Sequence, residues 1–245
     1  GVHLTCSNLP SSVNSIFSGE SSQKSTDYSE TNIQVEGVDE ADVIKTDGEY
    51  IYALAKGNLI IAKAYPADDA EILSEVELEG FSPSELFIHE NNLLIFGSAS
   101  YSFNKNEYGE KLSSPEYMQT MSVRLYDISN KENPELLRTV DFEGSYLTSR
   151  EIGSYVYFVV NSYPNYEKNI NCEDIVPGYR ESEDDLYPTI NYIHPISECT
   201  EIGYIEPLQA ESFITIASIS MIDKDEEVKK EVIVGSGQNV YASLE

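Results

Sequence analysis

Positive charge is scarce in this sequence, which has 15 Lys and Arg residues against 43 Asp and Glu and a formal net charge of -28 at pH 7. Such a surface repels phosphate backbones and anionic lipid headgroups, so nucleic acids and membrane surfaces are excluded as expected partners. No run of about 18 apolar residues occurs, and no signal-peptide pattern is visible. We therefore expect no direct membrane insertion by this segment. Because the sequence starts without Met and stops inside a strand-like stretch at residues 239–243, we expect an excised part of a longer protein.

Cysteine is also scarce, with three residues in all. Cys6 lies in a polar leader, and its state stays open, whereas Cys172 and Cys199 bracket one long irregular segment. No CxxC motif occurs, and the two later cysteines lack the nearby His or Cys pair that a zinc site needs. We expect a Cys172–Cys199 disulfide that staples a surface loop, which implies an oxidising, extracytoplasmic compartment. Two unrelated free thiols are the alternative.

Apolar material, in contrast, is plentiful: 40% of the residues are hydrophobic, with 18 Tyr and 8 Phe. This is too much for a disordered acidic chain and indicates a folded core. Residues 1–30 are Ser-rich without periodicity, which predicts a leader or linker. From residue 42 the pattern changes to short β-type runs at residues 42–46, 50–54, 58–63 and 72–78, with an Asp47-Gly48 turn between the first two that is a strong hairpin signal.

The same four-strand pattern then repeats twice. The second copy has runs at residues 84–89, 93–97, 122–127 and 136–142, and the third at residues 146–150, 155–160, 213–219 and 232–235. A repeated unit of four short strands is typical of a propeller blade, so we predict an all-β fragment of a β-propeller rather than a sandwich of hairpins. Blade 1 is expected at 42–80, blade 2 at 84–144 with an insertion at 98–120, blade 3 at 145–235 with an insertion at 162–212, and the start of a fourth blade at 238–245. Three blades cannot close a ring, so the fragment should expose a blade face that the missing blades of the same polypeptide cover.

Residues 28–48 read YSETNIQVEGVDEADVIKTDG. This segment resembles the opening motif of archaeal and bacterial secreted proteins that contain a β-propeller domain distantly related to WD40 repeats. The resemblance continues through residues 50–52, the insertion between the two later cysteines, and residues 235–243, so it covers nearly everything after Tyr28. It implies an exported propeller that runs well beyond this chain, and it implies no ligand or activity.

The order of strands in a blade predicts where the long segments lie. Both insertions join the second and third strands of their blades, and an acidic segment at residues 36–42 leads into the first strand of blade 1. In a propeller these connections meet on one face of the disc. Long loops on a rigid scaffold usually carry function, so we expect the binding site on that face.

The candidate binding residues on this face are Glu36, Asp39, Glu40, Asp42, Tyr187, Tyr192 and His194. Carboxylates this close together can supply the oxygen ligands that Ca²⁺ prefers, which makes Asp39, Glu40 and Asp42 a possible calcium site. The alternative is that these carboxylates cap turns or pair with Lys45. The tyrosines of the two insertions suit either binding or the packing of the loops themselves.

Signs of catalysis are few. None of the three histidines has a Ser or Cys in a recognisable nucleophile setting, and neither Gly-x-Ser-x-Gly nor HExxH occurs. We therefore expect a non-enzymatic extracellular or cell-envelope scaffold that binds a protein, a peptide or a glycan. A hydrolase or lyase with carboxylate or metal chemistry on the same face is the alternative, and a structural envelope part is a third. The acidity reflects either adaptation to salt or attraction of cations and basic partners.

Overall fold

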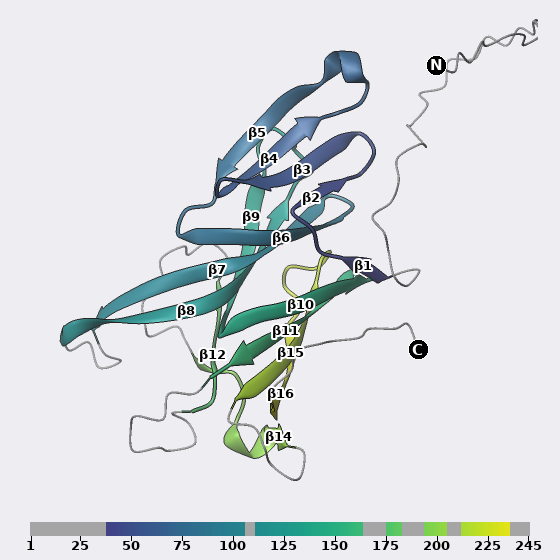
Figure 1. Cartoon of the computed structure of the whole chain (residues 1–245). Coiled ribbons are helices and arrows are strands. Elements are labelled where there is room, and N and C mark those ends of the chain that lie inside the picture. The colour runs from purple at the N-terminus through teal and green to yellow at the C-terminus, as the bar shows by residue number, and fades with distance from the viewer. Residues whose placement is uncertain (1–37, 106–110, 164–174, 183–193, 205–211, 236–245) are drawn as a thin grey trace, which may run out of the picture.

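The structure, a computed structural model, describes residues 38–105, 111–163, 175–182, 194–204 and 212–235. These residues form three sheets that stack one on the next, with the first sheet at the top of Figure 1 and the third at the bottom. The predicted all-β class is confirmed. No helix in the described ranges has the length and the apolar character needed to cross a membrane.

The first sheet is a four-stranded meander in the order β2-β3-β4-β5. Its strands are β2 (Ile44–Thr46), β3 (Tyr50–Ala55), β4 (Asn58–Lys63) and β5 (Glu71–Glu77), with a short 3-10 helix η1 (Ala67–Asp69) before the last. The predicted Asp-Gly turn joins β2 to β3. Gly48 there has a φ of 91°, a left-handed conformation that glycine adopts without strain, and the Asp47 carboxylate accepts the amide of Tyr50 at 2.8 Å.

The second sheet contains the chain's longest strands and has the order β13-β12-β9-β8-β7-β6. Its strands are β6 (Phe81–His89), β7 (Asn92–Lys105), β8 (Lys111–Asp127), β9 (Glu135–Glu143), β12 (Gly178–Ser182) and β13 (His194–Pro195). Most of the first predicted insertion, residues 98–120, is therefore not an irregular loop. The β7–β8 ladder continues through it to the pair Lys105 and Lys111, because a continued ladder satisfies the backbone groups that a loop would leave unpaired. This hairpin projects at the left of Figure 1.

The third sheet has the order β1-β10-β11-β15-β16-β14. Its strands are β1 (Val38–Glu40), β10 (Ser145–Ile152), β11 (Tyr155–Ser162), β15 (Phe213–Ser220), β16 (Lys229–Val234) and β14 (Gly203–Tyr204), and a 3-10 helix η4 (Cys199–Glu201) precedes β14. The second insertion thus contributes strands to two sheets: β12 and β13 extend the second sheet beyond β9, and β14 runs parallel to β16 in the third.

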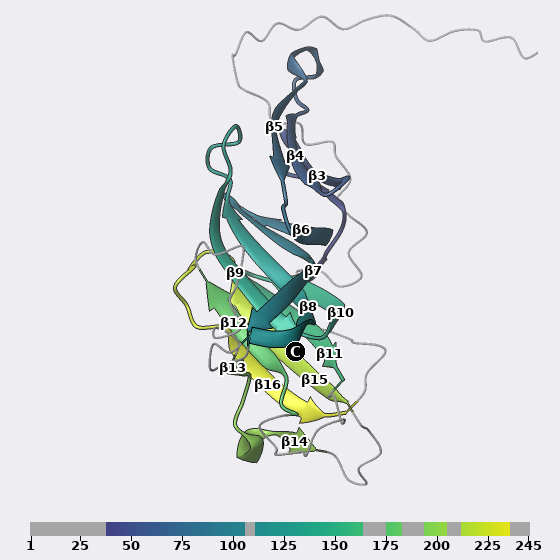
Figure 2. The same cartoon turned by 90° about the vertical axis from the view of Figure 1, so that its left-hand side faces the viewer.

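The second sheet is buried on both of its faces. Because neighbouring residues of a strand point to opposite faces, Leu93 and Ile95 pack toward the first sheet with Tyr52, while Leu94 and Phe96 pack toward the third. Aromatic rings join the second and third sheets, with the centroids of Phe96 and Phe158 5.4 Å apart. A middle layer that is apolar on both sides fits stacked blades better than a two-layer sandwich, and Figure 2 shows the stack from the side.

The outer faces of the stack are open. On the first sheet, Ile44 and Ile72 are 54% and 66% exposed on the face away from the second sheet. On the third sheet, Tyr157 and Ile216 are exposed on the face away from the second. In the described part of the chain the sheets therefore do not close into a ring, and two apolar faces remain uncovered, as expected for a fragment.

The described part of the acidic segment does not lie with the first insertion. His89 is the last residue of β6, and it contacts Glu151, whose partner on β1 is Asp39. The first insertion lies at the other end of β7, near Lys105. The prediction that the acidic segment shares a face with the first insertion is therefore wrong for residues 38–40, because β1 pairs along β10 and carries the chain in from the opposite end of the sheets.

Candidate functional site

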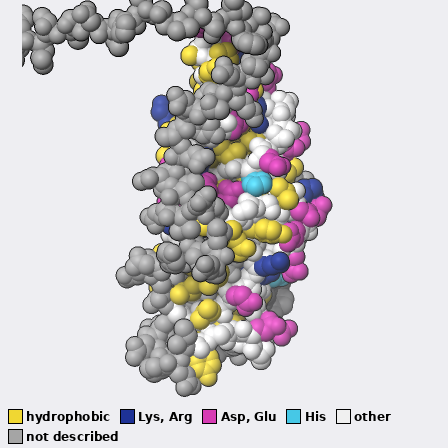
Figure 3. Space-filling view, turned by 90° about the vertical axis from the view of Figure 1, so that its right-hand side faces the viewer, with side chains coloured by type: hydrophobic (Ala, Val, Ile, Leu, Met, Phe, Trp, Pro, Cys, Tyr) yellow, Lys and Arg dark blue, Asp and Glu magenta, His cyan; other side chains and the backbone are white. Residues whose placement is uncertain are grey.

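A cluster of charged side chains lies where the first strands of the three sheets meet, and we call it the edge cluster. Its members are Asp39, Glu40, Lys45, His89, Arg150 and Glu151. The chain reaches this place because β1 pairs antiparallel with β10, after which Asp42 forms an isolated bridge with Leu86 of β6 before β2 begins. The acidic segment thus touches all three sheets within a few residues. Asp and Glu side chains are prominent on this side of the molecule (Figure 3).

Lys45 is the central cation of the edge cluster. Its ammonium donates to both carboxylate oxygens of Asp39, at 2.8 and 2.7 Å, and to the backbone oxygen of Glu40. The side chain is 7% exposed, and its nitrogen lies 5.7 Å from the centre of the Phe87 ring. Lys45 therefore fastens the acidic segment to the first sheet and packs on the second. This is the outcome that the sequence offered as the alternative to a calcium site.

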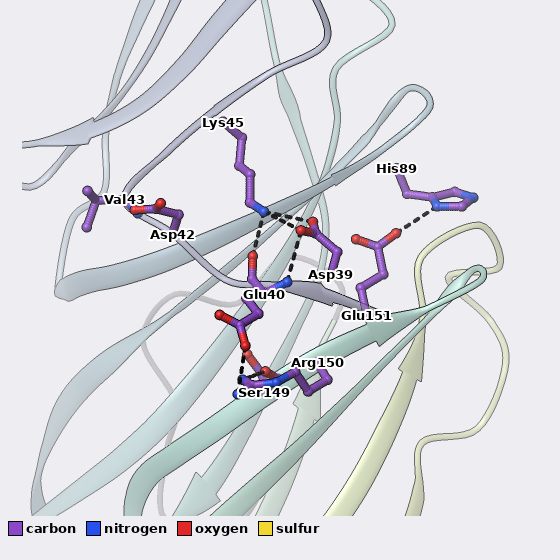
Figure 4. A network of polar contacts seen from close by, with 9 residues as sticks. All are labelled: Asp39, Glu40, Asp42, Val43, Lys45, His89, Ser149, Arg150 and Glu151. Atoms are coloured by element: carbon purple, nitrogen blue, oxygen red, sulfur yellow. Dashed lines mark hydrogen bonds and ion pairs between the residues drawn. The ribbon is translucent and has the colours of Figure 1, made fainter. Parts of the chain in front are cut away.

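Glu151 and His89 form the second pair, 2.8 Å apart between Oε1 and Nδ1 (Figure 4). Burial raises the pKa of Glu151, and the hydrogen bond from His89 acts in the opposite direction. Asp39 lies directly across from Glu151 in the β1–β10 ladder, and like charges in that position repel. Lys45 of the first sheet and His89 of the second thus lie against a carboxylate pair at the edge of the third.

Arg150 and Tyr146 complete the polar edge of β10. The guanidinium of Arg150 lies 3.2 Å from the Glu40 carboxylate and donates to the hydroxyl of Thr148 at 3.0 Å. Tyr146 donates to Glu85 of β6 at 2.5 Å, and burial followed by this bond raises the pKa of the Tyr146 hydroxyl. The Arg150–Glu40 pair thus joins β10 to β1 within the third sheet, and the Tyr146–Glu85 bond joins the third sheet to the second.

The predicted calcium ligands point to separate partners. Asp39 faces Lys45, Glu40 faces Arg150, and Asp42 is exposed and accepts the amide of Val43 at 2.7 Å (Figure 4). Within the described ranges no group of three or more His, Cys, Asp or Glu side chains is arranged to hold a metal ion. Calcium binding stays a prediction that this geometry does not support.

The other predicted site residues are separated from the edge cluster or cannot be placed. Glu36, Tyr187, Tyr192 and Cys172 lie outside the described residues, as do the leader at 1–30 and the residues 238–245 expected to start a fourth blade. His194 is exposed on β13, at the edge of the second sheet opposite β6. Among the predicted site residues that the structure describes, His194 is therefore separated from the edge cluster.

Sequence reasoning missed a buried pair that fastens the second insertion. Arg180 of β12 donates through Nε to Asp141 of β9 at 2.8 Å, and the two side chains are 1% and 2% exposed. The hydroxyl of Tyr101 donates to both oxygens of Asp141, at 3.1 Å each. Burial and the Asp141 charge raise the pKa of Tyr101 to about 12. On the other side of the sheet, buried Arg138 pairs with Glu181.

The tyrosines of the insertions divide into two groups. Tyr101 is buried, and Tyr179 is half-buried beneath Lys230, whose nitrogen is 4.6 Å from the ring centre, so both belong to the packing of the second sheet. Tyr163 and Tyr204, where the second insertion begins and near where it ends, are 72% and 62% exposed. Packing, one of the two roles that the sequence left open, is therefore seen for Tyr101 and Tyr179, and binding by the exposed tyrosines stays a prediction.

Stacked sheets of four consecutive antiparallel strands, joined in chain order, are the arrangement of propeller blades. The sequence agrees with this geometry, because the family described as "Beta propeller domain" matches residues 28–245. The chain belongs to that family. It is 29% identical over 168 residues to an uncharacterised protein of Methanocaldococcus jannaschii, covering 69% of this chain and 22% of that protein. It is also 28% identical over 154 residues to an uncharacterised protein of Archaeoglobus fulgidus, covering 57% of this chain and 20% of that protein.

The propeller-domain chain thus spans about a fifth of the length of these relatives. No solved structure matches it significantly. The family assignment agrees with the fold predicted from the repeats, and the relatives' names supply no activity or ligand.

Proposed function

We propose that this chain is part of an extracytoplasmic β-propeller, each sheet being one blade, and that it serves as a non-enzymatic binding scaffold. One observation carries the proposal: the described segments of the second insertion contribute strands to the sheets, and β12 is fastened through the buried Arg180–Asp141 pair. Binding surfaces are most effective when rigid elements hold them in place. We call the exposed side chains on or beside the described strands of the second insertion the insertion surface, and these strands hold it in place.

The exposed groups of the insertion surface indicate the chemistry of its partner. Tyr163, Tyr204 and His194 are exposed on or beside the second insertion, and the chain carries a net charge of -28. Exposed tyrosine rings offer large contact areas with little loss of conformational entropy. An acidic surface attracts positively charged partners. The partner that fits is a protein or peptide segment with basic and aromatic residues.

The edge cluster favours this function over a hydrolase or lyase. Asp39 pairs with Lys45 and Glu40 with Arg150. Glu151 is hydrogen-bonded to His89, which therefore contacts a carboxylate rather than a nucleophile. Carboxylates committed to internal pairs are poorly placed to act on a substrate. We assign the edge cluster to holding the three blades together.

The two open faces support the proposal that further blades of the same polypeptide flank this chain. Ile51 and Ile72 lie in one row across the first sheet, and Tyr157 and Ile216 lie on the far face of the third. Apolar sheet faces of this kind are usually covered in the whole protein. A distant relation to WD40 repeats agrees with this arrangement.

The proposed extracytoplasmic location depends on the cysteines. Cys199 is disulfide-bonded, and Cys172 is the partner that we propose. Disulfides persist mainly in oxidising compartments. Maleimide labelling of protein taken directly from its cells tests this: Cys172 and Cys199 should label only after reduction. Labelling of both before reduction would contradict the location.

The binding function is tested with a random peptide display library against the purified protein. We expect selected peptides to be enriched in Lys, Arg and aromatic residues, and to lose at least tenfold in affinity for a Tyr163→Ser/Tyr204→Ser variant. The matched control is Tyr65→Ser, which removes a tyrosine that is 42% exposed and lies between β4 and η1, next to the first sheet. Peptides that bind both variants equally, or a selection without specific binders, would show that the insertion surface is not a peptide site.

A further inference from the structure

A guanidinium without a carboxylate partner is buried in the second sheet. Arg124 of β8 is 2% exposed, and its Nη2 donates to the backbone oxygen of Glu79 at 3.2 Å. The ring centre of Phe81 lies 4.3 Å from the guanidinium carbon. Of the carboxylates in the described ranges, none forms an ion pair with it. A buried cation that lacks a counter-charge is strongly unfavourable, so its environment needs an explanation.

Three buried hydrogen-bonding atoms on neighbouring residues have no partner in the described part of the chain: Nε of Arg124 itself, Oγ of Ser122 and Oγ1 of Thr139. Ser122 precedes Arg124 by two residues, so both side chains point to the same face of the sheet. Thr139 of β9 is the direct ladder partner of Arg124 and points to that face too. The unpartnered atoms therefore belong to one small patch whose residues are at most 2% exposed.

The chemistry of the patch favours an anion. The Nε of arginine can only donate, so whatever contacts it must accept, and both hydroxyls can turn their protons toward the same acceptor. A buried carboxylate on the same face, Asp141, lies across the ladder from Ser122 and is already paired with Arg180. The charge of Asp141 is thus balanced by Arg180, and the charge of Arg124 is not balanced by it. A water molecule would satisfy the hydrogen bonds but would leave the extra positive charge without a counter-ion.

We propose that Ser122, Arg124 and Thr139 bind a small monovalent anion of about the size of chloride. All three residues are at most 2% exposed, so a ligand larger than a monatomic ion would have to displace buried side chains. Because Arg124 also holds the Glu79 carbonyl and the Phe81 ring, the ion joins β8 and β9 to the segment that connects the first sheet to the second. This inference does not depend on the proposed binding function.

Bromide, which replaces chloride and scatters anomalously, tests the site directly. Crystals of the protein grown in sodium bromide should give an anomalous peak within hydrogen-bonding distance of Arg124 Nε. A peak there supports the proposal. Density at that position without an anomalous signal identifies a water molecule and overturns it, as does an absence of density.

A solution measurement uses a matched pair of valine variants. Thr139→Val removes one proposed ligand, and Thr215→Val removes a hydroxyl that is equally buried and unpartnered but lies on β15 in the third sheet. The melting temperature is compared in sodium chloride and sodium gluconate at equal ionic strength, so that the acidic surface is screened equally in both salts. We expect the unaltered protein and Thr215→Val to melt at a higher temperature in chloride, and Thr139→Val to lose that difference. No chloride-specific difference in the unaltered protein, or its retention in Thr139→Val, would overturn the proposal.

Discussion

Replacing Arg180 by Met should release the second insertion from the second sheet. The variant keeps most of the side chain's apolar length. Among the described residues it leaves the Asp141 carboxylate, 2% exposed, with the two 3.1 Å contacts from the Tyr101 hydroxyl. Removing one partner of a buried ion pair typically costs about 3–5 kcal/mol, because the remaining charge is left uncompensated. We expect a loss of this size in the free energy that holds β12 on β9.

The loss should appear locally, because β12 has five residues and lies near the edge of the sheet. Opening of such a strand does not require the whole domain to unfold. With a factor of ten for each 1.4 kcal/mol, protection of the β12 amides against hydrogen exchange should fall by roughly 100- to 4,000-fold. Mass-spectrometric exchange of peptides covering residues 178–182 measures it.

Two comparisons make the result decisive. Lys224→Met breaks an exposed pair with Asp225, whose carboxylate is 75% exposed, and should change stability by less than about 1 kcal/mol. Adding Asp141→Asn to Arg180→Met removes the buried charge and should restore part of the protection. If Arg180→Met leaves exchange in β12 unchanged, the buried pair does not fasten the insertion and our reasoning fails.

Three further changes test the edge cluster and the packing. Lys45→Met should cost about 1–2 kcal/mol in urea unfolding and speed hydrogen exchange at residues 38–40, since Asp39 loses its cation. Glu151→Gln should gain stability relative to the unaltered protein as the pH rises from about 4.5. The pKa of Glu151 is higher in the folded protein than in the unfolded chain, so protonated Glu151 favours folding. This contribution is fully present below the pKa of the unfolded chain, and it is lost as the pH rises through the pKa of the folded protein. Gly97→Ala should cost about 1–3 kcal/mol by calorimetry, because its Cβ would lie 2.4 Å from the Ser82 backbone oxygen.

Each of these has a control or a contrary outcome. Lys63→Met breaks a looser pair, 3.7 Å from an exposed Asp69, and should leave exchange at residues 38–40 unchanged. A constant stability difference between pH 4 and 7 would contradict the role given to Glu151. Gly203→Ala, where the nearest atom is 3.8 Å away, should be tolerated, and equal losses at Gly97 and Gly203 would indicate that crowding is not the cause.

Much of the fold was predictable because its signals are local. Alternating apolar residues, the Asp47-Gly48 turn and the repeated strand order indicate strands and hairpins without knowledge of distant contacts. The pairing of Asp39 with Lys45 was within reach for the same reason, since six residues separate them. The length of the β7–β8 hairpin was not predicted, because the irregular composition of residues 98–120 indicates a loop and only the ladder itself reveals strands.

The remaining errors concern contacts between distant segments. His89 and Glu151 are 62 positions apart, and no local pattern indicates that the end of β6 meets the end of β10. Arg180 and Asp141 are separated by 39 positions and by a turn of the chain through the third sheet. The acidic segment was assigned to the wrong end because its position depends on the pairing of β1 with β10, and the sequence of β1 alone does not specify a partner.

That pairing also affects the order of events during synthesis. Val38 finds its ladder partner at Ile152, 114 positions later, so β1 leaves the ribosome long before the strand that receives it. Until β10 has been made, the segment is an unpaired strand beside the first sheet and the β6–β9 part of the second, a situation in which chains aggregate or pair wrongly. Asp39 and Glu40 make such a strand a poor partner for others like it, because stacked copies would bring their carboxylates together. The charges that later hold the three sheets together therefore also disfavour aggregation of the nascent chain before β10 is synthesised.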